Sequence, residues 1–268
     1  MSGDSLHRRG YRSAMHKASL NEAAAAGCLA LAGWPQAAAA GMHHCPWKVL
    51  ADPMCGSGTF LIEAALMATH SAPGLYRRRW PFERWPDFDA AAWRRVVADA
   101  KGACRPWKGT LLGNDIHSGA LSLAAKDLGN AGLSKLVQLT HGPCSEWQPT
   151  QRPAMVITNP PWGNRLMSPS GEGGPDGRQS EEASIDPDLE AAWRDLGFFL
   201  KGQCPEADVA VLSGNKHITS MLRMKADRRF PMTIGGVDCR LIKYKVLPPK
   251  PEGFVPAARE KIKSKSIW

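Results

Sequence analysis

The sequence predicts an α/β protein with a mostly parallel, doubly wound sheet of seven strands that ends in an antiparallel hairpin. Three observations lead to this fold class. Short apolar, β-branched runs such as residues 155–158 alternate with longer stretches of helical periodicity, and strands separated by helices pair in parallel. The turn Gly56-Ser57-Gly58 joins the first strand to its helix. Gly235-Gly236 separates two strand-like runs, which is typical of a hairpin.

The expected elements alternate along the chain. Ser19 is placed to cap the first helix, with Glu22 at capping-box spacing, and Gly33 is suited to end it. Several prolines and aromatic residues in 73–89 indicate an irregular, packed loop. The helices are expected over residues 19–32, 59–69, 90–103, 118–131, 189–200 and 218–226. The strands are expected over residues 48–52, 110–115, 136–140, 155–158, 209–213, 231–234 and 239–246.

The length of 268 residues suits one large domain, which we expect to span residues 1–247. Residues 168–188 hold six acidic side chains and one Arg among Gly, Ser and Pro, which indicates a disordered insert in that domain. Residues 248–268 end in a Lys-rich run and are expected to form a basic, flexible tail.

Charge and cysteine content restrict the function classes. A net charge of +9 favours an anionic partner such as nucleic acid. No apolar stretch approaches the roughly 18 residues of a membrane span, and the first residues lack the apolar core of a secretory signal. Seven cysteines without a CxxC pair indicate free thiols in a reducing compartment. We therefore expect a cytoplasmic protein and leave open an organelle such as a chloroplast or mitochondrion.

Two histidine–cysteine groups could be taken for metal ligands. They are His43-His44-Cys45 and the pair His141 and Cys144. Neither has a second ligand pair at zinc spacing, so we expect ordinary polar and core residues there and no metal site.

The segment from Asp52 to Thr59 has the properties of a ligand-binding turn. It lies between a predicted strand and a helix, where ligands bind in open parallel sheets. Gly56 and Gly58 allow a sharp turn and a close approach of the backbone to a ligand. The segment lacks the Lys-Ser/Thr ending of a phosphate-binding loop, and Asp52 instead suits a ligand with a positive amine. A purely structural turn remains the alternative.

The second strand ends in Asp115, at the place where a carboxylate normally grips a ribose diol. The alternative is that Asp115 caps the following helix. Because the glycine turn and this carboxylate occur one strand apart, together they favour a nucleoside-containing cofactor.

The fourth strand runs into Asn159-Pro160-Pro161-Trp162. The double proline ends the strand and stiffens the chain, which holds the Asn159 side chain and the Pro160 carbonyl as fixed acceptors. Two acceptors aimed at one NH2 group can present its nitrogen lone pair to an electrophile. Trp162 offers a flat face on which a base can stack, and the alternative is that it belongs to the core. The four residues predict methyl transfer to a planar amine.

These segments together carry a family resemblance. The chain resembles the guanine-N2 RNA methyltransferases that join an RNA-binding THUMP domain to a Rossmann-like methyltransferase domain, above all the bacterial ribosomal RNA branch. The similar segments are Leu6–Arg12, Asp52–Phe60, the aromatic loop Pro73–Pro86, Asn159–Gly163 and the closing hairpin Gly235–Leu241.

The resemblance implies a class I S-adenosylmethionine-dependent methyltransferase fold and transfer of a methyl group to guanine N2 in RNA, with ribosomal RNA expected first and transfer RNA second. By the resemblance, Asp115 holds the ribose of S-adenosylmethionine and Trp162 stacks on the guanine. The candidate cofactor-binding residues are Asp52, Met54, Cys55, Gly56, Ser57, Gly58, Thr59, Asp115 and Ile116. The candidate catalytic residues are Asn159, Pro160, Pro161 and Trp162.

The chain departs from the family pattern at two places. His141-Gly142-Pro143-Cys144 replaces the acidic residue expected near the adenine, and Asn21 stands where the family commonly has Lys. The chain also opens where the catalytic domain of the family begins, so we expect a partner chain or an N-terminal THUMP domain to supply RNA affinity.

Other functions remain open from the sequence. An adenine-N6 or cytosine-N4 DNA methyltransferase can use the same amine clamp, and protein glutamine methylation also uses an Asn-Pro-Pro motif. A catalytically idle RNA-binding module is the alternative outside the enzymes.

Overall fold

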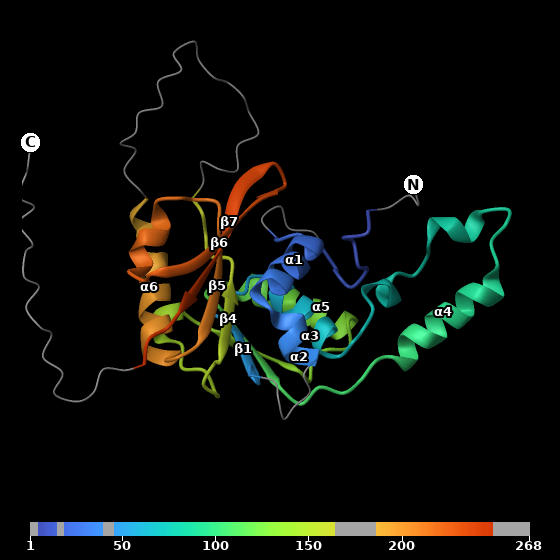
Figure 1. Ribbon diagram of the computed structural model, residues 1–268, viewed down its shortest axis with the longest axis horizontal. Coiled ribbons are helices and arrows are strands. Elements are labelled where there is room, and N and C mark those ends of the chain that lie inside the picture. The colour runs from blue at the N-terminus through green and yellow to red at the C-terminus, as the bar shows by residue number, and fades with distance from the viewer. Residues whose placement is uncertain (1–4, 15–18, 40–45, 164–185, 249–268) are drawn as a thin grey trace, which may run out of the picture.

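The computed structural model describes residues 5–14, 19–39, 46–163 and 186–248. Within them, seven strands form one sheet in the order β3-β2-β1-β4-β5-β7-β6 (Figure 1). The strands are β1 Val49–Asp52, β2 Thr110–Asp115, β3 Val137–His141, β4 Met155–Thr158, β5 Asp208–Ser213, β6 Ala226–Ile234 and β7 Val237–Lys245. The strands β1 to β5 pair in parallel, whereas β7 runs antiparallel to β5 and β6. The predicted sheet, with its terminal hairpin, is confirmed.

Helices cover both faces of this sheet. Leu50 of β1 belongs to an apolar cluster with residues of α1, α2, α3 and α5 on one face. Its neighbour Ala51 belongs to a second cluster with α6, η3 and η5 on the other. Because both faces are buried, the middle of each central strand is apolar, and polar residues such as Asp52 and Asp115 lie at the strand ends. The helices are α1 Glu22–Ala32, α2 Trp34–Ala39, α3 Thr59–Ala68, α4 Ala90–Gly102, α5 Ser118–Asn130 and α6 Pro187–Gln203. The short 3-10 turns are η1 Pro73–Tyr76, η2 Pro81–Arg84, η3 Cys144–Glu146 and η5 Ile218–Leu222.

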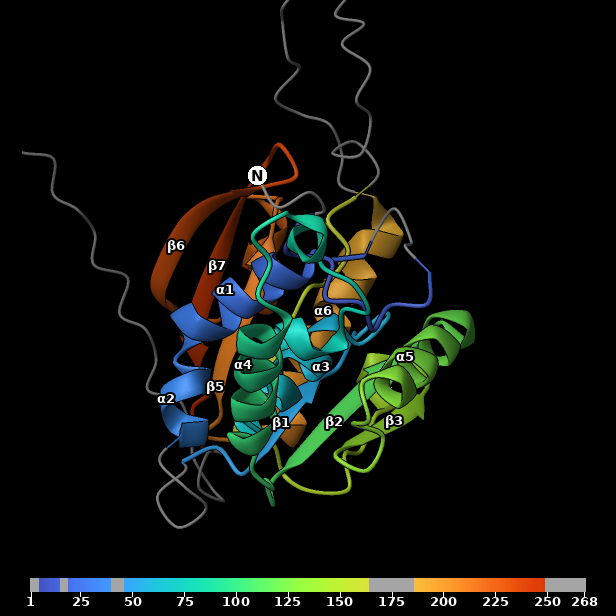
Figure 2. The same ribbon diagram turned by 90° about the vertical axis from the view of Figure 1, so that its right-hand side faces the viewer.

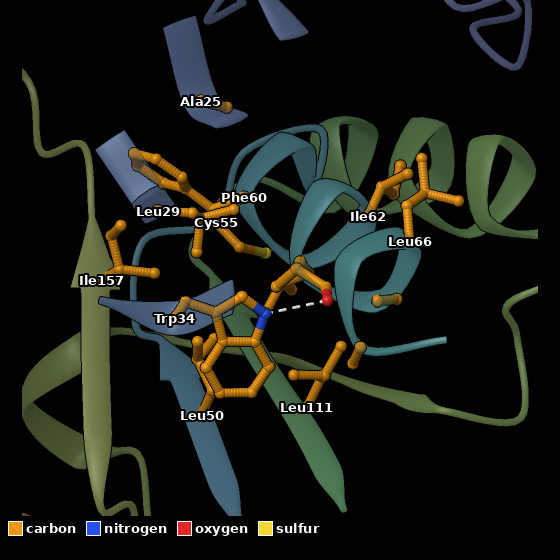
Figure 3. Packing of buried hydrophobic residues seen from close by; sticks show 14 of the residues in the cluster. Ala25, Leu29, Trp34, Leu50, Cys55, Phe60, Ile62, Leu66, Leu111 and Ile157 are labelled. Carbon is orange, nitrogen blue, oxygen red and sulfur yellow. Dashed lines mark hydrogen bonds between the residues drawn. The ribbon is translucent and has the colours of Figure 1, made fainter. Parts of the chain in front are cut away.

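The helix α2 was not expected from the sequence, and it begins with a tryptophan of the core. Trp34 is fully buried and lies over Leu50 and Leu111 of the sheet (Figure 3). Its Nε1 donates a hydrogen bond of 2.9 Å to the Ala64 carbonyl oxygen of α3. The polar atom of this side chain is therefore satisfied inside an apolar cluster.

The first helix begins later than predicted. Its N-cap is Asn21, whose Oδ1 accepts the backbone N–H groups of Ala23 at 2.8 Å and Ala24 at 3.1 Å. Ser19 was therefore the wrong cap, and its hydroxyl instead lies 3.3 Å from the Ser57 hydroxyl. Gly33 ends the helix with φ of 97°, as predicted.

The predicted helix over residues 218–226 is wrong. The chain forms only the short turn η5, which ends at Arg223 with a left-handed φ of 48°, and β6 begins at Ala226. β6 is an edge strand whose side chains are mostly exposed, so its sequence lacks the apolar pattern that marks a strand. The hairpin itself turns at Gly235 and Gly236, both with positive φ, a combination that a two-residue turn between twisted strands requires.

A segment of the chain stands apart from both layers. Residues 73–105, which we call the arm, contain η1, η2 and α4 and lie at the side of the molecule (Figures 1 and 2). The expected loop over 73–89 is irregular apart from its two 3-10 turns. None of the residues in η1, η2 or α4 is fully buried. The loop still packs, because Tyr76 of η1 is partly buried against the core cluster and Phe82 of η2 contacts Trp93 of α4.

The predicted insert lies mostly outside the described residues. Residues 168–185 are not described, and residues 186–188 belong to the start of α6, which Asp186 caps. The predicted tail is also outside them, apart from Pro248.

Candidate methyl-transfer site

The predicted site residues follow three adjacent strands. Asp52 ends β1, Asp115 ends β2 and Asn159 follows β4, and β1 lies between the other two strands in the sheet. The carboxyl ends of parallel strands share one edge, and β1 is where the strand order reverses. Ligands bind at such a point in open α/β sheets.

The glycine turn takes a backbone path that favours glycine. Gly56 and Gly58 have φ of 54° and 74°, and Gly58 is the N-cap of α3. The N–H of Cys55 donates to the Asn114 carbonyl oxygen at 2.9 Å, and the N–H of Gly56 donates to Asp115 Oδ2 at 2.7 Å. The end of β2 therefore fixes the turn that follows β1.

A hollow of about 100 Å³ lies at this turn. It brings together Asp52 from the end of β1 and Asn159 from the end of β4. Six of its lining residues were predicted to bind the cofactor: Asp52, Met54, Cys55, Gly56, Ser57 and Thr59. Ser19, Leu20 and Phe60 complete the lining with Asn159. Gly58, Asp115, Ile116, Pro160, Pro161 and Trp162 do not line it.

Asp52 is a buried carboxyl whose charge is not matched. It is 2% exposed, and its Oδ1 accepts the Met54 N–H at 3.2 Å. Burial raises the pKa of Asp52 to about 7, and the neighbouring Asp115 adds to this rise, while the Thr158 hydroxyl and the Met54 N–H act against it. Within the described residues, no Lys or Arg forms an ion pair with Asp52. A ligand with a positive group would stabilise the ionised form.

Asp115 is only 7% exposed and uses both of its oxygens on the backbone. Oδ2 accepts from Gly56, and Oδ1 accepts the His117 N–H at 2.9 Å. It does not cap α5, because that helix starts after His117 without a side-chain cap. The next residue, Ile116, is 59% exposed and offers an apolar surface beside the turn.

Asn159 presents an unused acceptor. Its Oδ1 is buried and has no hydrogen-bond partner among the described residues. A buried acceptor without a partner costs roughly 1–3 kcal/mol, so a ligand that donates a hydrogen bond at this place would recover that free energy. Pro160 is buried and Pro161 is exposed, and the Pro161 carbonyl oxygen accepts a hydrogen bond of 2.9 Å from Trp193 Nε1 in α6.

The indole of Trp162 is held on one side by the end of β5 and the segment that follows it. Its Nε1 donates to the Leu212 carbonyl oxygen at 3.2 Å, and the Asn215 amide donates to the Trp162 carbonyl oxygen at 3.4 Å. A Cβ placed on Gly214 would lie 2.5 Å from Trp162 Cε3, closer than any contact allows. Trp162 is half-buried and packs against the core cluster, so it belongs in part to the core, and its stacking on a base stays a prediction.

Two supports of the site were missed in the sequence. Asn114 is 1% exposed, and its Nδ2 donates to the carbonyl oxygens of Pro53 at 3.3 Å and Gly142 at 2.9 Å. It thereby joins the turns after β1 and β3. A buried Asn next to a strand-end Asp is the signal that could have identified it.

Arg12 is the second support. Its Nη2 donates to Thr59 Oγ1 at 2.7 Å and to the Leu20 carbonyl oxygen at 2.6 Å, and its Nε lies 3.0 Å from Glu22 Oε1. The arginine links the N-terminal segment to two residues that line the hollow. Glu22, noted in the sequence as a capping-box residue, is its ion-pair partner.

His141 and Cys144 flank the turn after β3. His141 Nε2 lies 3.0 Å from the Ile116 carbonyl oxygen. Cys144 is buried, which raises the pKa of its thiol well above the usual range. Within the described residues, no group of three or more His, Cys, Asp or Glu side chains could hold a metal ion; His43-His44-Cys45 lies outside them.

None of the described helices is both long and apolar enough to span a bilayer.

Comparisons with known proteins identify the family of the chain. Residues 9–172 match a family described as "RMKL-like, methyltransferase domain". Two curated relatives, each named ribosomal RNA large subunit methyltransferase K/L, come from Photobacterium profundum and Allochromatium vinosum. They are 34% and 35% identical to this chain over 91% and 92% of its length. The chain spans only 31% of either relative.

Solved structures show the same fold. A protein described as a methyltransferase, SMU.472, was solved with SAH and shares 25% identity at a TM-score of 0.72, covering 94% of this chain and 58% of that one. A protein described as a methylase from Clostridium difficile 630 shares 28% identity at a TM-score of 0.71 over 93% of this chain and 58% of that one. The fold is the Rossmann-like fold of class I S-adenosylmethionine-dependent methyltransferases. By its sequence and its fold, the chain belongs to the RMKL-like methyltransferase domain family.

Proposed function

We propose that this chain transfers a methyl group from S-adenosylmethionine to the exocyclic N2 of guanine in large-subunit ribosomal RNA. One observation carries the proposal: the unmatched carboxyl of Asp52 and the buried, unpartnered Oδ1 of Asn159 belong to the same hollow. One group suits a cation and the other suits an amine, which are the two partners of such a reaction. The relatives named for ribosomal RNA methylation support the choice of substrate.

The cofactor side is formed by the turn from Asp52 to Thr59. We infer that ionised Asp52 receives the positive methionine end, and that the backbone at Gly56 and Gly58 lies close to it. Asp115 holds the turn through Gly56 and would receive the ribose hydroxyls, and Ile116 would cover the adenine with its exposed side chain. When bound, S-adenosylmethionine supplies an electrophilic methyl group on a positive sulfur.

The target side is formed by Asn159, Pro160 and Trp162. The guanine N2 amine would donate one N–H to Asn159 Oδ1 and the other to the Pro160 carbonyl oxygen. This orientation points the nitrogen lone pair toward the methyl group, and alignment of that kind lowers the barrier of a bimolecular step. Trp162 would stack on the base, so a base in a duplex must first turn out of the helix. The amine loses its proton after transfer, and no dedicated general base is required.

RNA affinity is expected to involve more than this domain. We propose that an additional domain or a partner chain contributes to RNA binding. On this proposal the protein acts where ribosomal RNA is made, in the cytoplasm or in an organelle with its own ribosomes.

The direct test is methyl transfer from labelled S-adenosylmethionine to unmodified 23S ribosomal RNA, transfer RNA and duplex DNA in parallel. Digestion of the RNA and mass spectrometry should show N2-methylguanosine from the ribosomal RNA. Label found only in DNA would overturn the choice of RNA. N2-methylguanosine found only in transfer RNA would support the proposed reaction and show that its substrate is transfer RNA rather than ribosomal RNA.

A further inference from the structure

The two ends of the arm lie next to each other where it joins the rest of the fold. The Arg105 N–H donates to the Thr69 carbonyl oxygen at 2.9 Å, where the chain leaves and rejoins the body. Arg77 donates to the carbonyl oxygens of Arg8 at 3.1 Å and Ser5 at 2.9 Å. The root of the arm is therefore fixed to the N-terminal segment, whereas α4, beyond it, buries none of its residues.

The outer part of the arm is held together by aromatic rings. Phe82 stacks on Trp80 with 5.5 Å between ring centroids and meets Trp93 of α4 edge-on at 4.9 Å. Trp85 and Phe88 also contact Phe82, at 6.2 Å and 6.0 Å. These rings attach the η2 segment to α4 without closing the surface.

An apolar hollow of about 310 Å³ remains open on this ring cluster. It is lined by Phe82, Trp85, Asp87, Phe88, Asp89, Ala92, Trp93 and Val96. The side chains of Trp85 and Val96 are 53% and 54% exposed. Contiguous exposed apolar surface of this kind marks binding sites on soluble proteins, and the volume reaches the lower end of ligand pockets, about 300 Å³.

The charge of the arm identifies the class of partner. Its 33 residues hold eight basic and four acidic side chains, a net charge of +4 within a chain that carries +9. Arg84, Arg94 and Arg95 are exposed on the η2 segment and α4. Two acidic side chains line the hollow. Asp89 is already engaged, because its Oδ1 caps α4 through two backbone N–H groups, whereas Asp87 is exposed. Aromatic rings interleaved with arginines are the pattern of single-stranded nucleic-acid binding.

We propose that the arm is a second RNA-binding surface, separate from the methyl-transfer site, where an unpaired base stacks on Trp85 and Arg84, Arg94 and Arg95 contact phosphates. The proposal rests on the proposed function for RNA as the substrate. A protein partner would use the apolar hollow but would have no need of the excess arginines, so the charge favours RNA.

The test is binding of a fluorescein-labelled single-stranded RNA of about a dozen nucleotides. We expect Trp85→Ala to weaken binding roughly 5- to 100-fold through loss of stacking. Arg94→Glu/Arg95→Glu should weaken it at least about tenfold and reduce the slope of log Kd against log salt by about 1.4, for two lost phosphate contacts. Both variants should unfold at the wild-type temperature, since they lie outside the core.

The matched control is Lys126→Glu/Lys135→Glu, which makes the same charge change at exposed positions outside the arm. It should change RNA affinity by less than about twofold. Equal losses in both double variants would overturn the proposal, because they would show an effect of net charge alone. Wild-type affinity in the arm variants would also overturn it, and would favour a protein partner for the hollow.

A parallel measurement of methyl transfer separates this proposal from the proposed function. If wild-type protein binds the RNA through the arm but methylates no RNA, the proposed function is wrong and the proposal for the arm stands. If wild-type protein methylates ribosomal RNA and the arm variants do so with unchanged KM for RNA, the proposal for the arm is wrong and the proposed function stands.

Discussion

Trp34 and Trp85 belong to two regions of one chain that place aromatic side chains in opposite ways. Trp34 is fully buried between the sheet and α3, and its indole N–H has a carbonyl partner. Trp85 is 53% exposed in the arm, among rings that contact one another and leave a hollow open to solvent. The first region therefore uses aromatic surface for stability, whereas the second leaves it available to a ligand.

Stability should separate the two tryptophans most strongly. Trp34→Ala removes a large buried side chain and should lower the free energy of unfolding by about 3–5 kcal/mol. Trp85→Ala should change it by less than about 0.5 kcal/mol, as expected for an exposed position. Urea unfolding followed by circular dichroism gives both values. Equal losses would contradict the assignment of the arm as a region outside the core.

The pH dependence of cofactor binding tests another specialised region, the hollow that Asp52 and Asn159 line. In the free protein, burial raises the pKa of Asp52 to about 7. The protonated carboxyl therefore contributes to the stability of the fold below about pH 4, and this contribution is lost as pH rises through 7. A cationic ligand requires the ionised form, so binding below pH 7 must release a proton. Affinity for S-adenosylmethionine should rise about 50-fold between about pH 5 and pH 7.

Calorimetry in buffers of different ionisation enthalpy measures this proton. At about pH 6 we expect nearly one proton released per cofactor, because the amine of the ligand is already protonated there. Asp52→Asn should abolish this release. Release that persists in this variant would assign the proton to another group.

Gly214 should matter through its contact with Trp162. A Cβ at this position overlaps the indole, so Gly214→Ala should displace Trp162 and reduce kcat/KM for RNA by roughly tenfold, while the Kd for S-adenosylmethionine stays unchanged. Gly202→Ala is the matched control, because its Cβ would meet nothing within 4 Å. Equal kcat/KM values for the two variants would show that Trp162 does not stack on the base.

The smallest expected effect concerns the first helix. Asn21→Ala removes the side chain that caps α1 and should lower the free energy of unfolding by about 1 kcal/mol. Ser19→Ala, at the position that the sequence pattern favoured, should leave it within about 0.5 kcal/mol of wild type. Thermal unfolding of both variants measures the difference, and the reverse order would restore Ser19 as the cap.

Local signals predicted the parts of the molecule that depend on local chemistry. Gly56, Gly58 and Gly235-Gly236 identified two turns because positive φ favours glycine, and the apolar runs identified the buried strands. Ser19 was preferred to Asn21 because both residue types suit a cap and only the backbone geometry decides between them. β6 was placed too late because an exposed edge strand has no apolar face to reveal it.

The parts of the site that depend on long-range contacts were not predictable. Asn114 connects Pro53 with Gly142, and Arg12 connects Leu20 with Thr59. These partners are far apart in sequence, and only the order of the strands brings them together. The same holds for Asp52 and Asn159, which the sequence presented as separate motifs and which the fold places in one hollow.

The measurement that tests the central claim most directly compares Asp52→Asn and Asn159→Ala for both cofactor binding and methyl transfer. If one hollow holds the cofactor at Asp52 and the amine at Asn159, Asp52→Asn should weaken S-adenosylmethionine binding on the order of 100-fold at about pH 8. Asn159→Ala should bind the cofactor within about twofold of wild type and transfer methyl groups to ribosomal RNA on the order of 100- to 1,000-fold more slowly. Wild-type transfer by Asn159→Ala, or wild-type cofactor affinity in Asp52→Asn, would contradict the account.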